Sequence, residues 1–134
     1  MSLVLDTGPL YAWYDRSDRW HEATRALFVA EPGALLLPAP VISEVDYLLG
    51  TIGSGAREAL YSDLVEGQYL VATVSPAGYA RIQELNARYR SLELGFVDAA
   101  VMAIAEERGV ARVATTDRRD FSAVELSVPL DLLP

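Results

Sequence analysis

The sequence predicts an α/β protein, a three-layer α/β/α sandwich with a central, mainly parallel sheet of about five strands. Two observations predict this class. Short apolar segments alternate with helical segments along the chain, as in parallel sheets with helical crossovers. The apolar segments are also uninterrupted, which is typical of strands buried on both faces. With 134 residues, 51% of them hydrophobic, and neither repeats nor a linker, we expect a single domain, residues 1–134.

The predicted strands are short apolar runs bounded by Gly, Pro or polar residues. Pro38 and Pro40 close the second run, and Pro129 follows the last, which we expect to be an edge strand. The five runs occupy residues 2–6, 34–37, 69–73, 110–115 and 124–128.

The predicted helices are recognised by apolar periodicity and by their start and stop residues. Residues 8–14 follow the first strand directly, and residues 55–66 end before Gly67, a common residue after a helix. Ser75 and Pro76 begin a helix that runs to about residue 90, and Gly109 stops an Ala-rich helix at residues 96–108. The remaining helices are 20–30, with Trp20, Ala23, Leu27 and Ala30 on one face, 41–51, with Val41, Val45, Leu48 and Leu49 inward, and a turn or short helix at 118–121.

The composition excludes several kinds of protein. The absence of Cys excludes disulfides and zinc thiolates, and the single His21 excludes a site with several histidines. The longest apolar run, residues 34–42, is too short and too proline-rich to cross a membrane, and no signal peptide is visible. We therefore expect a cytoplasmic protein with no membrane partner.

The charge pattern leaves two interpretations open. The net charge of −8 argues against a polyanionic partner, yet all 11 basic residues are Arg, which suits phosphate and base stacking. An all-Arg chain can equally reflect genomic base composition. Arg118 and Arg119 form one local basic pair, and Arg81, Arg88 and Arg90 form a stripe that is more typical of a solvated helix face.

Four acids stand beside apolar runs, where a carboxylate is costly: Asp6, Glu44, Asp98 and Asp117. Asp6 and Asp117 follow predicted strands, while Glu44 and Asp98 lie in the first turns of predicted helices. These positions all face the carboxyl edge of a parallel sheet, where ligands bind. The alternative for the two helical acids is a favourable interaction with the helix N-terminus.

A group of carboxylates without His or Cys specifies a hard, oxygen-seeking cation, of which Mg²⁺ is the typical example. Such an ion activates water and neutralises charge at a phosphodiester, so the predicted reaction is metal-assisted phosphodiester hydrolysis. Thr7 and Thr116, each next to a strand-end acid, could hold a metal-bound water or a carboxylate in place.

The residues that carry these acids also resemble a known family. Leu5-Asp6-Thr7, Ser43-Glu44-Val45, residues 95–100 and residues 116–121, in this order, resemble the PIN-domain ribonucleases, and more closely the VapC toxins of bacterial VapBC toxin–antitoxin systems. The likeness extends from residue 3 to about residue 128. The position after Thr7 is often Ser or Asn in the family and is Gly8 here, which removes any side-chain contact from that position.

The resemblance implies a toxin that is a Mg²⁺- or Mn²⁺-dependent endoribonuclease, is usually a homodimer, and is neutralised by a VapB antitoxin. Its substrates would be structured RNAs, either tRNA or the sarcin–ricin loop of ribosomal RNA, and the residues around Glu44 and Asp117 favour the second. Asp6 and Asp98 match the principal metal-binding acids, and Glu44 and Asp117 complete the catalytic quartet, with Asp117 also as a metal ligand. Arg118 and Arg119 would bind RNA phosphates or form salt bridges.

Two further acids and three other functions complete the expectations. We interpret Asp46 as a surface residue and Asp120 as a cap of the short turn before Phe121, although Asp120 could be a fifth acid of the site. A phosphoacceptor receiver domain requires a Lys, and this chain has none. A haloacid-dehalogenase-type phosphatase requires an Asp at position 8, which is Gly. A PIN-like binding module without activity remains the main alternative.

Overall fold

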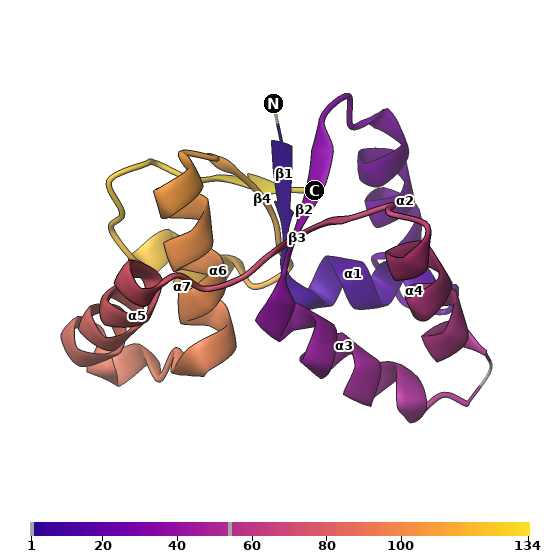
Figure 1. Cartoon of the computed structure of the whole chain (residues 1–134), viewed down its shortest axis with the longest axis horizontal. Coiled ribbons are helices and arrows are strands. Elements are labelled where there is room, and N and C mark those ends of the chain that lie inside the picture. The colour runs from indigo at the N-terminus through magenta and orange to yellow at the C-terminus, as the bar shows by residue number, and fades with distance from the viewer. Residues whose placement is uncertain (1, 54) are drawn as a thin grey trace.

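Five parallel strands form the central sheet of the computed structural model, which describes residues 2–53 and 55–134 (Figure 1). The strands lie in the order β3-β2-β1-β4-β5, so the chain begins in the middle of the sheet and changes direction after β3. Every strand pair is parallel, as predicted. The strands are β1 (Ser2–Leu5), β2 (Ala34–Pro38), β3 (Leu70–Ala72), β4 (Arg112–Ala114) and β5 (Asp131–Leu133).

Helices cover both sides of this sheet and complete the three-layer sandwich (Figure 1). One side carries α1 (Thr7–Tyr14), α2 (His21–Ala30), α3 (Ala39–Gly50) and α4 (Ala56–Val65). The other side carries α5 (Pro76–Arg88), the short 3₁₀ helix η1 (Arg90–Leu92), α6 (Gly95–Arg108) and α7 (Arg118–Ala123). The predicted α/β/α class is therefore confirmed.

The longest runs of buried core residues lie in β1 and α6. Leu3, Val4 and Leu5 have no exposed surface, because β1 has neighbouring strands on both edges and helices on both faces. In α6, every residue from 99 to 105 is buried, and four of these seven are alanines. Small side chains let this helix approach the sheet closely, which fixes the position of its first turn relative to the end of β1.

Two predicted elements differ from the structure. Residues 124–128 are not a strand, and the edge strand is β5, three residues later, paired with β4 from Asp131 onward. The reason is topological: α7 lies at the carboxyl edge of the sheet, so the chain must first return to the opposite edge before it can run parallel to β4. The inward face of α2 also differs, because Thr24 and Phe28 are buried while Ala23 and Ala30 are exposed.

The helix α3 begins two residues earlier than predicted, at Ala39, with Pro40 in its first turn. Proline is tolerated there because the first N–H groups of a helix have no partner within it. Within the described residues, no helix is long and apolar enough to cross a membrane.

Candidate active site

Asp6 lies at the end of the central strand, next to the point where the chain turns from β1 into α1. Only 4% of its surface is exposed. Its Oδ2 accepts a 2.8 Å hydrogen bond from Thr115, but its Oδ1 is buried and has no hydrogen-bond partner in the described part of the chain. Burial raises the pKa of Asp6, and the charges of Glu44 and Asp117 raise it further, against the hydrogen bonds that lower it. A positively charged partner at the Oδ1 atom of Asp6 would therefore stabilise the ionised form of this carboxyl group.

Thr115 connects the ends of two adjacent strands. It follows β4 directly and is 1% exposed. Its Oγ1 donates to Asp6 and accepts a 3.0 Å hydrogen bond from the backbone N–H of Asp117. Because β1 and β4 are neighbours at the point where the strand order changes direction, this hydroxyl holds two of the predicted acids at the ligand-binding edge of the sheet.

Asp98 reaches the same edge from the opposite layer, in the first turn of α6. Burial raises its pKa to about 7, with further contributions from the charges of Asp6, Asp117, Asp120 and Glu44, in that order of size. The ionised form of Asp98 is thus disfavoured both by burial and by the neighbouring negative charges. A bound cation would reverse both effects.

Asp117 and Asp120 bring two more carboxylates to Asp98. One carboxyl oxygen from each of the three residues lies within 4.8 Å of the other two. Asp117, not Asp120, caps α7: its Oδ1 accepts a 3.4 Å hydrogen bond from the N–H of Asp120. The expected capping role of Asp120 is therefore wrong, and its own carboxyl group faces the other acids.

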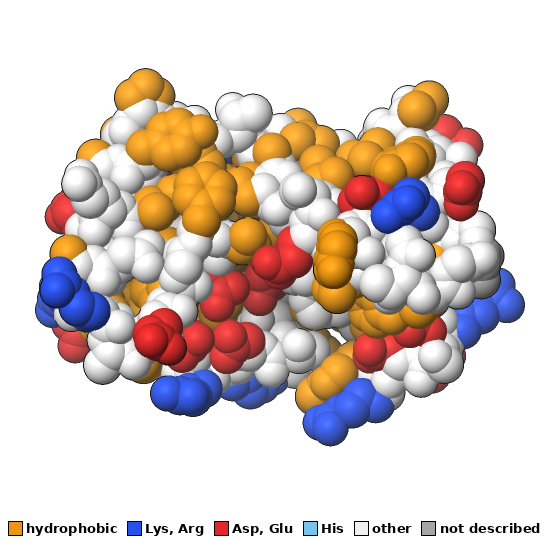
Figure 2. Space-filling model, turned by 90° about the horizontal axis from the view of Figure 1, so that it is seen from below, with side chains coloured by type: hydrophobic (Ala, Val, Ile, Leu, Met, Phe, Trp, Pro, Cys, Tyr) orange, Lys and Arg blue, Asp and Glu red, His pale blue; other side chains and the backbone are white. Residues whose placement is uncertain are grey.

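Glu44 lies further out than the three aspartates. Its side chain is exposed on α3, where it lines a hollow with Pro40, Ser43, Tyr47 and Phe96. It nevertheless contributes to the raised pKa of both Asp6 and Asp98, so it belongs to the same electrostatic environment. Figure 2 shows acidic side chains gathered in the hollowed face below the sheet, flanked by hydrophobic side chains.

Neither of the two predicted threonines donates a hydrogen bond to a carboxylate among the described residues. The hydroxyl of Thr7 is buried without a hydrogen-bond partner among the described residues. The hydroxyl of Thr116 lies against Gly8: a Cβ atom at that glycine would be 2.3 Å from Thr116 Oγ1. The carboxylate of Asp6 is instead held by the neighbouring Thr115, which the sequence analysis did not single out.

Arg118 and Arg119 are both exposed at the start of α7, directly after the acidic cluster. The guanidinium of Arg118 donates a hydrogen bond to the carbonyl oxygen of Pro134. Within the described residues, neither arginine forms a salt bridge. Of the two expected roles, the structure thus leaves phosphate contact open, most directly for Arg119.

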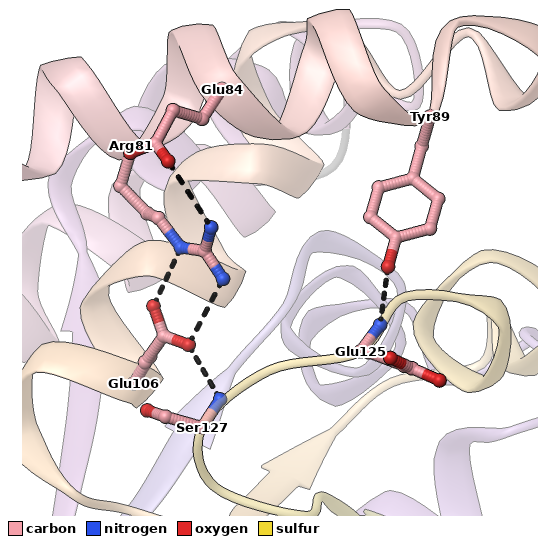
Figure 3. Close-up of polar contacts among 6 residues, drawn as sticks. All are labelled: Arg81, Glu84, Tyr89, Glu106, Glu125 and Ser127. Carbon is pink, nitrogen blue, oxygen red and sulfur yellow. Dashed lines mark hydrogen bonds and ion pairs between the residues drawn. The ribbon is translucent and has the colours of Figure 1, made fainter.

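Arg81, the first arginine of the predicted stripe, has a structural role, whereas Arg88 and Arg90 are exposed. Arg81 donates 2.8 and 3.2 Å hydrogen bonds to the carboxylate of Glu106, which also accepts from the N–H of Ser127 (Figure 3). Nearby, the N–H of Glu125 donates to the hydroxyl of Tyr89. These contacts fasten α5 and α6 to the segment that leads to β5, so Arg81 is not free to bind a ligand.

Asp46 is likewise structural, and it is less exposed than predicted. It lies on α3 and pairs with Arg57 of α4 at 3.0 Å, and it also accepts a hydrogen bond from Tyr61. These contacts join two consecutive helices, so the carboxylate of Asp46 is already paired and is not an acid of the site.

These groups fit a hard divalent cation. Three carboxylates converge, and a fourth, Asp6, is buried beside them with one unbonded oxygen. Oxygen ligands without sulfur or imidazole are the donor set of Mg²⁺ and Mn²⁺. Without a cation, so many close carboxylates repel one another, which costs folding free energy.

Fold and site together define a class: α/β proteins with a cluster of carboxylates at the carboxyl edge of a parallel sheet. Residues 3–126 match the family described as PIN domain, and the chain belongs to that family. It is 28% identical over 123 residues to Ribonuclease VapC26 of Mycobacterium tuberculosis, covering 91% of either chain.

Solved structures share the fold. The crystal structure of Mycobacterium tuberculosis VapC20, a sarcin–ricin loop cleaving toxin, matches with a TM-score of 0.82 and 22% identity, over 95% of this chain and 98% of that one. VapBC2 from Rickettsia felis, bound to a DNA fragment from its promoter, matches over the whole of either chain with a TM-score of 0.71 and 16% identity. At these identities the likeness shows the fold alone.

Proposed function

We propose that this chain is the toxin of a type II toxin–antitoxin system and acts as a Mg²⁺-dependent endoribonuclease on structured RNA. The observation that carries the proposal is the cluster of Asp98, Asp117 and Asp120, with the buried Asp6 acting on Asp98, in a PIN domain. A purely structural role would leave these carboxylates hydrogen-bonded or paired with arginine. Instead, one oxygen of Asp6 is unsatisfied, and the pKa of Asp98 is raised to about 7.

In this proposal, Asp6, Asp98 and Asp117 hold the cation. When bound, the cation supplies an activated water and charge neutralisation at the phosphodiester. Thr115 keeps Asp6 and Asp117 at their separation, so the ligands are arranged before the substrate arrives. Glu44, the fourth residue of the catalytic quartet, is exposed on α3. Its carboxylate would accept a hydrogen bond on the side from which RNA would enter.

RNA would be bound by groups around the pocket rather than by the whole surface, because the net charge is −8. Arg119 and Arg118 are exposed next to Asp117 and would contact phosphates. Thr7 and Thr116 adjoin Asp6 and Asp117 in the sequence, and their hydroxyls would assist substrate or water positioning. The sarcin–ricin loop is the first RNA to test, since the structurally similar VapC20 is a sarcin–ricin loop cleaving toxin, and tRNA is the alternative.

The partner would be a VapB-type antitoxin. The ring of Trp13 packs against that of Phe28, with the two ring centroids 5.4 Å apart. Together with Val29, Leu35 and Tyr69, these rings line a groove that would accept the apolar face of a helix. Tyr14 is less available than its sequence position suggests, because its hydroxyl bonds Asp63 and Tyr69 at 2.5 Å.

Beyond this groove, an arginine from the antitoxin would pair with the carboxylates of the pocket and exclude the cation. The support for such a plug is the same cluster of unpaired acids that fits a metal. A second copy of the chain would pack against the exposed aromatic side chains of Tyr47, Tyr79 and Phe96 and form the expected homodimer. Because the proposed substrates are tRNA and ribosomal RNA, the activity would take place in the cytoplasm.

Mapping of RNA 5′ ends after induced expression tests the proposed activity. The wild-type chain should arrest growth and produce one new, abundant 5′ end in a structured RNA. Asp98→Asn keeps the shape of the side chain but removes a charge, so it should produce neither effect at equal protein level. A new 5′ end that persists in the Asp98→Asn strain would contradict the proposal.

Co-expression with the small protein encoded next to the gene tests the partner. Growth should resume, and the two proteins should purify together. Arrest that continues despite a stable complex would exclude the plug. A complex that forms equally well when Asp6 and Asp98 are both changed to Asn would place the affinity in the groove alone.

A further inference from the structure

The carboxyl group of Asp120 lies where a ligand of the proposed cation would lie. One of its oxygens is within 4.8 Å of oxygens of both Asp98 and Asp117. The closest group of carboxylates among the described residues is thus made of three aspartates, Asp98, Asp117 and Asp120, and does not include Glu44.

The local geometry of α7 explains why Asp120 points inward. Asp117 is the N-cap residue and Asp120 is the third residue of the helix, a spacing that places both side chains on one side of the first turn. In a reciprocal cap, the third residue would accept a hydrogen bond from the N–H of the N-cap residue. That N–H already donates to Thr115 Oγ1, so the carboxyl group of Asp120 is released from capping.

The released carboxyl group is not satisfied elsewhere. Its Oδ1 is buried and has no hydrogen-bond partner within residues 2–53 and 55–134. The neighbouring Asp6, 4% exposed, has an unpartnered Oδ1 as well. Buried carboxylate oxygens without donors are costly. A cation bound by Asp98, Asp117 and Asp120 would satisfy the oxygen of Asp120.

We propose that Asp120 is an additional ligand of the cation, directly or through one water, together with Asp98 and Asp117. This inference rests on the proposed function and adds a fifth acid to the predicted quartet. The competing explanation is that Asp120 is a first-turn acid that favours the helix N-terminus. The two explanations predict opposite effects of the Asp120 charge on the stability of the metal-free protein. An acid that favours the helix N-terminus makes this protein more stable, whereas a ligand crowded against other acids makes it less stable.

Calorimetric titration of the metal-free protein with Mn²⁺ tests the inference without RNA or activity. Asp120→Asn keeps the size of the side chain and should weaken Mn²⁺ binding by about tenfold or more. Asp131→Asn is the matched control, because Asp131 is an exposed acid at the start of β5, and it should bind like the wild type.

Binding of Mn²⁺ by Asp120→Asn within about twofold of the wild type would overturn this inference and leave the proposed function standing. Absence of Mn²⁺ binding in the wild type would overturn both.

Thermal unfolding provides a second measurement on the same proteins. In chelator, Asp120→Asn should be at least as stable as the wild type, because one of the repelling charges is removed. In saturating Mn²⁺, the increase in Tm should be smaller for Asp120→Asn than for either other protein, since stabilisation by a ligand follows its affinity. A loss of stability in chelator together with an unchanged Mn²⁺ shift would assign Asp120 to helix stabilisation and contradict the inference.

Discussion

The hydroxyl of Thr115 donates a 2.8 Å hydrogen bond to Oδ2 of Asp6, although 109 positions separate the two residues in the sequence. The bond crosses from the end of β4 to the end of β1, in a site where both side chains are almost completely buried. It fixes one oxygen of Asp6, while the other has no hydrogen-bond partner among the described residues.

Removal of this hydroxyl should disturb both neighbours. Thr115→Val keeps the volume but leaves Asp6 without its donor and the N–H of Asp117 without its acceptor. We expect a loss of about 1–3 kcal/mol in the free energy of unfolding and a clear loss of RNA cleavage. Thr115→Ser keeps the hydroxyl and should retain most activity. Equal activity of the Val and Ser variants, measured as kcat/KM, would show that the bond has no role in positioning.

The raised pKa of Asp98 predicts how the stability of the metal-free protein depends on pH. Its pKa is about 7 in the folded protein against an ordinary value of 3.8, so the folded state binds this proton more tightly than the unfolded state. The contribution of Asp98 to stability is therefore full below the unfolded pKa and is lost as the pH rises to about 7.

Asp98→Asn lacks this titration and isolates it from the other acids. In chelator, urea unfolding should show that the stability difference between Asp98→Asn and the wild type grows in favour of the variant from about pH 4 to about pH 8. A bound divalent cation should reduce that difference. A difference independent of pH would mean that the carboxyl group of Asp98 titrates normally in the folded protein.

The close contact between Gly8 and Thr116 predicts a coupled pair of substitutions. Gly8→Ala places a Cβ 2.3 Å from Thr116 Oγ1, which must then move. In a Thr116→Ala background the nearest remaining atom is the Cβ of residue 116 at 3.5 Å, which is an ordinary contact. There Gly8→Ala should stabilise α1 by up to about 1 kcal/mol, because alanine favours helix. A double-mutant cycle by urea unfolding measures the coupling, and additive effects would show that Thr116 turns away freely.

The two exposed arginines of α7 should differ in their contribution to RNA binding. Arg119→Ala should weaken RNA binding and reduce the slope of its salt dependence by about one, as expected for the loss of one phosphate contact. Arg118 also bonds the carbonyl of Pro134, so its replacement should lower stability as well. Arg88→Ala is the control, because Arg88 lies on α5 and pairs with Glu125. A larger loss of affinity from Arg88→Ala would move the RNA-binding surface to that helix.

Much of the fold could be predicted from the sequence, because buried parallel strands and their helices leave strong local patterns. The position of β5 could not be predicted, since the apolar run around Leu132 is no longer than the segment before Pro129 that was predicted to be the edge strand. What decides between them is the distance that the chain must travel back across the sheet, which is a property of topology. The inward face of α2 was also mispredicted, because alanines carry little information on burial.

The acids of the site were predictable because each interrupts apolar sequence, and the structure brings Asp6, Asp98 and Asp117 to one edge of the sheet. The role of Thr115 was not predicted, and Asp120 was expected to cap the short turn, with a fifth acid of the site as the alternative. Both depend on which of several nearby groups takes the N–H of Asp117, and that choice is made in three dimensions. The one available signal was the three-residue spacing of Asp117 and Asp120, which fits a cap equally well.

The central claim, that the acidic pocket makes this PIN domain a metal-dependent ribonuclease, is tested most directly by cleavage of RNA by the purified protein. Total RNA and an isolated sarcin–ricin loop would be incubated with the wild type and with Asp98→Asn, in excess chelator and after addition of Mg²⁺ or Mn²⁺. The account predicts specific cleavage by the wild type only when metal is present, restored by metal after chelation, and orders of magnitude less cleavage by Asp98→Asn. Full cleavage in excess chelator, or undiminished cleavage by Asp98→Asn, would contradict it.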